Sequence, residues 1–169
     1  HSLQQMKDQG EKISMLTAYD YTMAKMVDAA GVDCILVGDS ASNVMAGHET
    51  TLPITLDQMI YHASSVIRAV DRALVVVDLP FGTYQGDSKQ ALNSAIRVMK
   101  ESGGHAVKLE GGSSMANRAK AIANSGIPVV GHIGLTPQSS AAFGGYRVVG
   151  REPSEVENLR RSIQVLEEA

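Results

Sequence analysis

The sequence predicts an α/β protein built on a parallel β-sheet, and three observations support this prediction. Short apolar runs alternate along the chain with segments whose apolar residues recur at helical spacing. The short runs contain few polar residues, which is typical of strands that are covered on both faces. Each run is followed by a helical segment, and parallel strands need crossover connections of this kind.

Five strands are expected, each followed by a helix. The strands are predicted at residues 13–18, 34–37, 73–78, 106–110 and 129–132. The helices that follow them are predicted at residues 21–30, 56–70, 88–102, 115–124 and 153–169, with a short amphipathic helix over 1–10 before the first strand. Ser88 is expected to be the N-cap of its helix, and Pro153 suits a first helical turn. Residues 42–55 and 134–151 are expected to be long polar loops.

Composition indicates one globular domain over residues 1–169. The hydrophobic content is 44%, the charged content is 20%, and no linker-like shift in composition divides the chain. The net charge of −3 argues against nucleic acid and anionic membranes as partners. No apolar run approaches the roughly 20 residues of a membrane span. The single cysteine, Cys34, fits a reducing compartment, so a cytoplasmic protein is expected.

Acidic side chains end three successive predicted strands. Asp39, Asp78 and Glu110 each follow or close an apolar run. The carboxyl ends of parallel strands lie at one rim, so three carboxylates meeting there would repel one another. A bound divalent cation removes this repulsion, and oxygen-only ligands favour Mg²⁺ over Zn²⁺. A single strand-end acid is more simply a helix cap or an ion-pair partner, but three in succession favour a metal site.

Two further polar residues belong to the same strand ends. Lys108 lies two residues before Glu110 and therefore on the same face of its strand. A buried lysine needs an anionic partner, so Lys108 is expected either to bind an anionic substrate or to act as a counter-ion at the rim. His132 ends the fifth strand and is either a proton carrier or a structural residue. Tyr19 follows the first strand, where it either lines the pocket or packs.

Three architectures fit this pattern. The first is an open doubly wound sheet, and the second is a (β/α)8 barrel cut short; both bind ligands at the carboxyl ends of the strands. A complete barrel takes about 200–250 residues or more, so a barrel here would hold about five βα units, with its remaining strands beyond Ala169. The third is a signalling receiver module, but its lysine should follow the last strand, whereas Lys108 and Glu110 share a strand.

Seven motifs connect the sequence to a known family. They are Leu16-Thr17-Ala18-Tyr19-Asp20-Tyr21, Leu36-Val37-Gly38-Asp39-Ser40, Thr51-Leu52-Pro53, Asp78-Leu79-Pro80-Phe81, Val107-Lys108-Leu109-Glu110-Gly111-Gly112, Gly131-His132-Ile133-Gly134-Leu135-Thr136-Pro137-Gln138-Ser139 and Phe143-Gly144-Gly145-Tyr146. They stand in the family's order and cover nearly the whole chain. On these motifs the sequence resembles the 3-methyl-2-oxobutanoate hydroxymethyltransferase (ketopantoate hydroxymethyltransferase) family.

The resemblance implies a (β/α)8 TIM barrel of the phosphoenolpyruvate/pyruvate type and a Mg²⁺-dependent homo-oligomer, decameric in bacterial members. It implies that the metal is held at Asp39, Asp78 and Glu110. It also implies that the 2-oxoacid contacts four positions, Asp39, Ser40, Asp78 and Lys108. The family's general base is a glutamate on the following strand, which lies beyond Ala169.

The implied reaction is hydroxymethyl transfer from 5,10-methylenetetrahydrofolate to 3-methyl-2-oxobutanoate, giving 2-dehydropantoate for pantothenate biosynthesis. In it, Lys108 is expected to bind the anionic oxygen of the enolate, and Ser40 to orient the carboxylate. His132 is expected to assist catalysis, either from behind the residues that contact the substrate or from the folate side. Two alternatives stay open: another Mg²⁺-enolate C–C lyase or mutase barrel, and a catalytically inert fragment that lacks the general base.

Overall fold

The computed structural model describes residues 3–169, and its centre is a five-stranded sheet. The strands are β1 (Met15–Thr17), β2 (Cys34–Val37), β3 (Leu74–Asp78), β4 (Ala106–Glu110) and β5 (Val129–His132). All neighbouring strands are parallel. The predicted α/β class is therefore confirmed, and each of the five predicted strands is present, with the first shorter than expected.

The order of the strands decides between the architectures that the sequence left open. The sheet runs β1-β2-β3-β4-β5, so every strand lies beside the next strand of the chain. A doubly wound sheet reverses its strand order at a switch point, and a receiver module does the same. Unbroken sequential order is the arrangement of a (β/α) barrel. The chain therefore contains five consecutive units of a barrel-type sheet.

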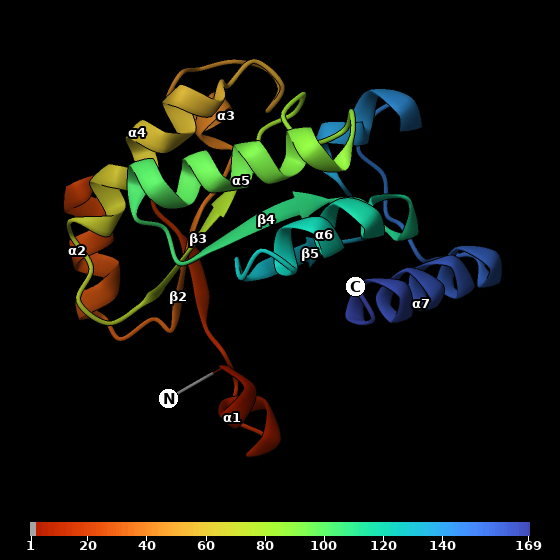
Figure 1. Cartoon of the computed structure of the whole chain (residues 1–169), viewed down its shortest axis with the longest axis horizontal. Helices are drawn as coiled ribbons and strands as arrows, with labels where there is room; N and C mark the ends of the chain where they lie inside the picture. The colour runs from red at the N-terminus through yellow and green to blue at the C-terminus, as the bar shows by residue number, and fades with distance from the viewer. Residues whose placement is uncertain (1–2) are drawn as a thin grey trace.

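Four helices, α2, α4, α5 and α6, form one layer outside the sheet. Figure 1 shows α4 and α5 crossing the strands side by side, with α2 next to α4 and with α6 on the far side of α5. The helices are α1 (Leu3–Asp8), α2 (Tyr21–Ala29), α3 (Ala41–Val44), α4 (Leu56–Ile67), α5 (Ser88–Ser102), α6 (Ala116–Ala123) and α7 (Pro153–Glu167), with 3-10 turns η1 (Ser113–Met115) and η2 (Pro137–Phe143). Among the described residues, no helix has the length and apolar character needed to cross a membrane.

The main core lies between this helical layer and one face of the sheet. Alternate residues of the central strands point into it and are fully buried, namely Ile35, Val37, Val75, Val77, Val107 and Leu109. They pack with buried residues of α4 and α5, namely Met59, Ala63, Val66, Ala91, Ala95 and Val98. Because side chains alternate along a strand, the intervening residues, including Lys108, lie on the opposite face.

Three expectations about local structure need correction. The N-cap of α5 is Asp87, not Ser88, because the Asp87 carboxylate accepts the backbone N–H of Gln90 at 2.7 Å. The two predicted polar loops contain the short helices α3 and η2. The predicted helix over 1–10 is present as α1, while its first two residues, His1 and Ser2, lie outside the described residues.

The two outer strands of the sheet are the least covered. All three residues of β1 are exposed, with Met15 at 44% and Leu16 at 53% of their accessible surface. The residues of β5 are half-buried or exposed. The inner strands β2, β3 and β4 are mostly buried. The acids Asp39, Asp78 and Glu110 therefore lie at the ends of the three best-covered strands and are themselves buried.

Candidate active site

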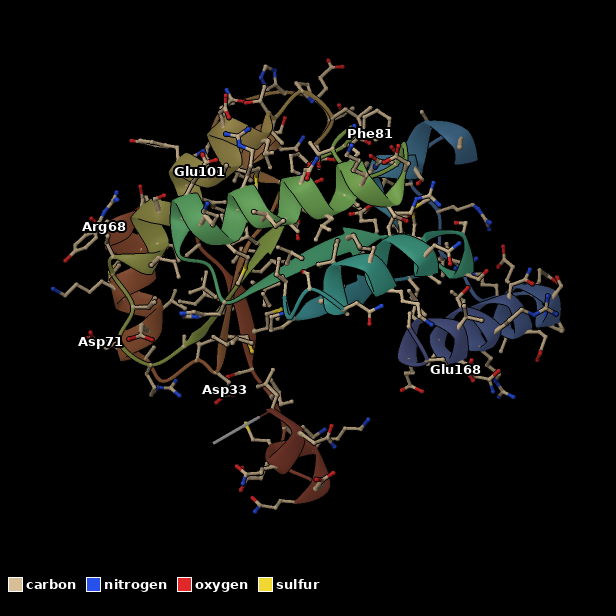
Figure 2. The ribbon with its side chains drawn as sticks, in the orientation of Figure 1. Asp33, Arg68, Asp71, Phe81, Glu101 and Glu168 are labelled. Atoms are coloured by element: carbon tan, nitrogen blue, oxygen red, sulfur yellow. The ribbon has the colours of Figure 1, made fainter. Side chains whose placement is uncertain are left out.

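The candidate site lies at the carboxyl ends of β2, β3 and β4. Figure 2 shows this end through Phe81, which follows β3, at the opposite side of the molecule from Arg68 and Asp71, which precede β3. Asp39, Asp78 and Glu110 have only 4%, 3% and 5% of their surfaces exposed. The structure thus brings the three predicted acids to one buried rim.

The register of the sheet places Lys108 among these acids. Asp78 of β3 is paired with Lys108 of β4, and Glu110 with His132 of β5. The Lys108 ammonium lies 3.1 Å from Asp78 Oδ1 and 3.9 Å from Glu110 Oε1, and the side chain is 11% exposed. Lys108 is therefore a largely buried cation within ion-pair distance of two carboxylates, as its position on the strand face predicts.

The charge balance at Asp78 is unfavourable to its ionised form. Burial, and to a smaller extent the nearby Asp39, raise the pKa of Asp78 to about 6 against the opposing effect of Lys108. Its Oδ2 atom accepts the backbone N–H of Asp39 at 3.0 Å, while Oδ1 has no hydrogen bond of good geometry. Burial raises the pKa of Asp39 as well. The rim therefore has more buried negative charge than Lys108 neutralises.

This acid cluster fits a divalent cation by its chemistry. Its ligand atoms are all carboxylate oxygens, which suit Mg²⁺, and an added positive charge would stabilise the ionised form of Asp78, whose pKa is raised mainly by burial and to a smaller extent by Asp39. Within residues 3–169, no three side chains of Asp, Glu, His or Cys form a ready-made metal centre. Some of the carboxylate oxygens instead accept hydrogen bonds from neighbouring residues. The oxygen ligands that Mg²⁺ needs are therefore present, but in this structure they belong to a hydrogen-bonded network.

Ser40 and His132 lie at the edge of this cluster. The Ser40 hydroxyl is hydrogen-bonded to the Tyr19 hydroxyl at 2.7 Å, so Tyr19 contacts a predicted substrate-binding residue. His132 Nδ1 lies 3.3 Å from Lys108 Nζ and 3.4 Å from Glu110 Oε1, and 31% of its side chain is exposed. All five predicted strand-end residues and Ser40 therefore lie at the same end of the sheet.

The structure adds residues that received no role from the sequence. Gln138 donates from its amide to Asp39 Oδ2 at 2.8 Å and from its backbone to Glu110 Oε2 at 3.0 Å. Tyr84, whose ring is 1% exposed, hydrogen-bonds to both Gln138 and Glu110. A neutral amide side chain in a loop contributes neither to a hydrophobic period nor to a charge pattern. In the sequence, Gln138 could therefore be noticed only as part of a family motif.

Thr51 is a second residue without an assigned role. Its hydroxyl is buried and makes no hydrogen bond of good geometry, although it lies close enough to Asp39 to lower the pKa of that carboxyl slightly. Burying an unpaired hydroxyl costs about 1–3 kcal/mol. Thr51 is thus a buried polar group beside Asp39 that the sequence did not single out.

Comparisons of sequence agree with the resemblance seen in the motifs. A sequence model of the family described as ketopantoate hydroxymethyltransferase matches residues 1–169. A 3-methyl-2-oxobutanoate hydroxymethyltransferase of Flavobacterium johnsoniae is 72% identical over 166 residues, which cover 98% of this chain and 61% of that protein. The chain spans about three fifths of the length of the curated relatives it matches.

Comparisons of structure concern the fold alone, because the sequence identities are low. Phosphoenolpyruvate phosphomutase from Streptomyces platensis subsp. rosaceus superposes with a TM-score of 0.71 at 18% identity, covering 98% of this chain and 59% of that one. A phosphonopyruvate hydrolase, solved with oxalate and Mg²⁺, superposes with a TM-score of 0.70 at 13% identity, covering 95% and 56%. These neighbours have the barrel fold that the strand order indicates. With the family match extending over the whole sequence, the chain belongs to the ketopantoate hydroxymethyltransferase family.

Proposed function

We propose that this chain carries the metal and oxoacid sites of a Mg²⁺-dependent hydroxymethyltransferase. The reaction is transfer of a one-carbon unit from 5,10-methylenetetrahydrofolate to 3-methyl-2-oxobutanoate, giving 2-dehydropantoate. Membership of the family supports the reaction. The family also supports a homo-oligomer, decameric in bacterial members, and the single buried cysteine fits a cytoplasmic location.

The observation that carries the proposal is the buried ammonium of Lys108. It lies 3.1 Å from Asp78 at the end of the sheet where a barrel enzyme binds its ligands. Removing a proton next to a 2-oxo group leaves negative charge on the oxygen of an enolate. A buried, fixed cation stabilises such a charge more strongly than water does, because the surrounding dielectric is low.

The other residues have roles that follow from their positions. Ser40, held by Tyr19, orients the substrate carboxylate through its hydroxyl. Asp39, Asp78 and Glu110 hold the cation. When bound, Mg²⁺ supplies Lewis-acid polarisation of the 2-oxo group. His132, which is partly exposed beside Lys108, lies on the side from which the folate approaches.

As the family resemblance implies, the proton at C3 of the substrate is removed by a glutamate on the strand that follows β5 in the family's barrel. Residues 1–169 supply the residues that bind the metal and the oxoacid. The alternative, a C–C lyase or mutase activity, is supported only by similarity of fold, since the structural neighbours share the barrel at 13–18% identity. The family match favours the transferase.

A turnover assay on the intact protein tests the proposal. Substrate, methylenetetrahydrofolate and Mg²⁺ are supplied, and 2-dehydropantoate is measured for wild type and for Lys108→Met. We expect the variant to lose roughly 10²–10³-fold in kcat, the usual cost of removing one group that stabilises a developing oxyanion. The matched control is Lys120→Met, an exposed lysine of α6, which should retain wild-type activity.

Two results would contradict the proposal. One is wild-type protein that forms no 2-dehydropantoate but cleaves a C–C bond in a different oxoacid. The other is a Lys108→Met variant as active as Lys120→Met, which would remove Lys108 from the chemistry while leaving the overall reaction in place.

A further inference from the structure

The side chain of Gln138 has all four of its amide hydrogen-bonding positions occupied. Its Nε2 donates to Asp39 Oδ2 at 2.8 Å and to the Leu79 carbonyl at 3.0 Å. Its Oε1 accepts from the Tyr84 hydroxyl at 2.6 Å and from Gln85 Nε2 at 3.0 Å. The residue is 5% exposed. A buried amide with every donor and acceptor paired is held in one orientation.

Gln138 also contacts a second acid through its backbone. Its N–H donates to Glu110 Oε2 at 3.0 Å, while its side chain holds Asp39. Asp39 follows β2 and Glu110 ends β4, so one residue of η2 links the acids on either side of β3. In each carboxylate the contact engages one oxygen and leaves the other for a further partner.

Tyr84 determines which way the Gln138 amide faces. The Tyr84 hydroxyl accepts the backbone N–H of Glu110 at 3.0 Å, so its single proton is free to be donated elsewhere. The shorter of its two acceptor contacts is Gln138 Oε1 at 2.6 Å, compared with 3.2 Å to the Glu110 carbonyl. With the amide oxygen turned to Tyr84, the amide nitrogen must face Asp39.

We infer that Gln138 is a positioning residue for the cation site: it holds the Asp39 and Glu110 carboxylates in place for a divalent cation. Tyr84 contributes by setting the orientation of the Gln138 amide. The inference rests on the proposed function, since it concerns the metal of that same site. Neither residue touches the reacting atoms. Residues that orient metal ligands typically change metal affinity roughly 10- to 100-fold when they are removed.

The test is calorimetric titration of the intact, metal-free protein with MgCl2, without substrate. Gln138→Met keeps the length of the side chain but removes both hydrogen bonds of Nε2, and we expect its Kd for Mg²⁺ to rise roughly 10-fold or more. Tyr84→Phe removes one hydroxyl and should raise the Kd at least about threefold. In the double variant, Tyr84→Phe should raise the Kd by a smaller factor than it does in the wild-type background, because the hydrogen bond from Tyr84 to Gln138 is already lost and only the direct contacts of Tyr84 with the Glu110 backbone remain.

Ser102→Ala is the matched control. Its hydroxyl is buried and bonded to the Val98 carbonyl at 2.6 Å, but it lies at the end of α5, before β4, and so away from the site. It should cost stability with no change in Kd. If Gln138→Met does not fold, judged by circular dichroism, the comparison of Tyr84→Phe with Ser102→Ala decides the question.

The outcomes separate the inference from the function on which it rests. The inference is wrong, and the proposed function stands, if both single variants bind Mg²⁺ with the wild-type Kd. The same holds if the changes in binding free energy of the two single variants add fully in the double variant. Wild type that makes 2-dehydropantoate but binds no Mg²⁺ would overturn the inference and the metal requirement together. Wild type that binds Mg²⁺ with the expected differences but makes no 2-dehydropantoate would support the inference and overturn the reaction.

Discussion

Lys108 and Gln138 lie in the same site, yet only one of them could be recognised from sequence. A lysine inside an apolar strand is costly to bury, and its spacing from Glu110 places both on one face, so its role could be argued from the pattern alone. Gln138 has no charge, and its partner Asp39 is 99 residues away. Its role depends on a tertiary contact, which no local pattern encodes.

Asp28 shows how one carboxylate can order a connection. From α2 it accepts the backbone N–H groups of the three residues that precede β3, at 3.0, 3.4 and 2.7 Å from Asp71, Arg72 and Ala73. Burial acts to raise the pKa of Asp28, but these hydrogen bonds and the charge of Arg72 outweigh it and hold the pKa below its usual value. Asp28 thereby ties α2 to the start of the central strand.

Replacing Asp28 by Asn should lower the free energy of unfolding by about 1 kcal/mol at pH 7, because three backbone N–H groups, of which that of Ala73 is half-buried, exchange a charged acceptor for a neutral one. A carboxylate with a depressed folded pKa stabilises above its unfolded pKa of about 3.9, and this stabilisation is lost as the pH falls through the folded value. The difference between wild type and variant in urea denaturation should therefore shrink below about pH 4.

Glu157→Gln is the control for Asp28, since it removes the same charge from an exposed position of α7. It should leave stability within about 0.5 kcal/mol of wild type. A stability difference for Asp28→Asn that stays constant from pH 7 to pH 3 would show that the ionised carboxylate is not the stabilising group.

The helices and strands were largely predictable as elements, and the errors are confined to their ends and to short turns. Periodicity located all five strands and the six longer helices, because their apolar residues recur at the spacing of a strand or of a helix. The four residues of α3 are too few to show a helical period. The 3-10 turn η2 is held in place by the hydrogen bonds of Gln138, and these too are invisible to periodicity.

The N-cap of α5 allows a direct test at this scale. Asp87→Ala should destabilise the protein by about 0.5–2 kcal/mol, because the Gln90 N–H loses its acceptor at the start of a 15-residue helix. Ser88→Ala should have an effect below about 0.5 kcal/mol, because its hydroxyl bonds an exposed carbonyl of Asn117 instead. Chemical denaturation of the two variants side by side measures both, and equal losses would contradict the cap assignment.

For the whole molecule, alternation of strands and helices established a parallel sheet but not its strand order. Both a doubly wound sheet and a barrel satisfy the same alternation, since the order depends on which side of the sheet each helix crosses. The family resemblance predicted the barrel, and the sequential order of the five strands confirms that type of sheet. Its consequence is that β1 and β5 form the two margins of the sheet, while Figure 1 shows α2, α4, α5 and α6 together on one side of the strands.

The uncovered margins predict the behaviour of residues 1–169 produced alone. Met15 and Leu16 are about half exposed on β1, and open strand edges with apolar side chains promote association. We expect the isolated segment to self-associate in size-exclusion chromatography and to bind a hydrophobic dye. Leu16→Lys should reduce the association, whereas Asn93→Lys, which adds the same charge on α5, should not. A monodisperse monomer that binds no dye would contradict this expectation.

The link from Gln138 to Asp39 also bears on the order of folding. Contacts between residues far apart in sequence form late, because the long intervening chain must first be brought together. The strands that carry the three acids can pair with their neighbours along the chain as each is synthesised, but the residue that locks two of the acids arrives only after β5. The cluster of Asp39, Asp78 and Glu110, which we propose as a cation site, is therefore expected to mature late: a nascent chain that has reached β4 has the strands that carry the acids but not the residue that orients two of them.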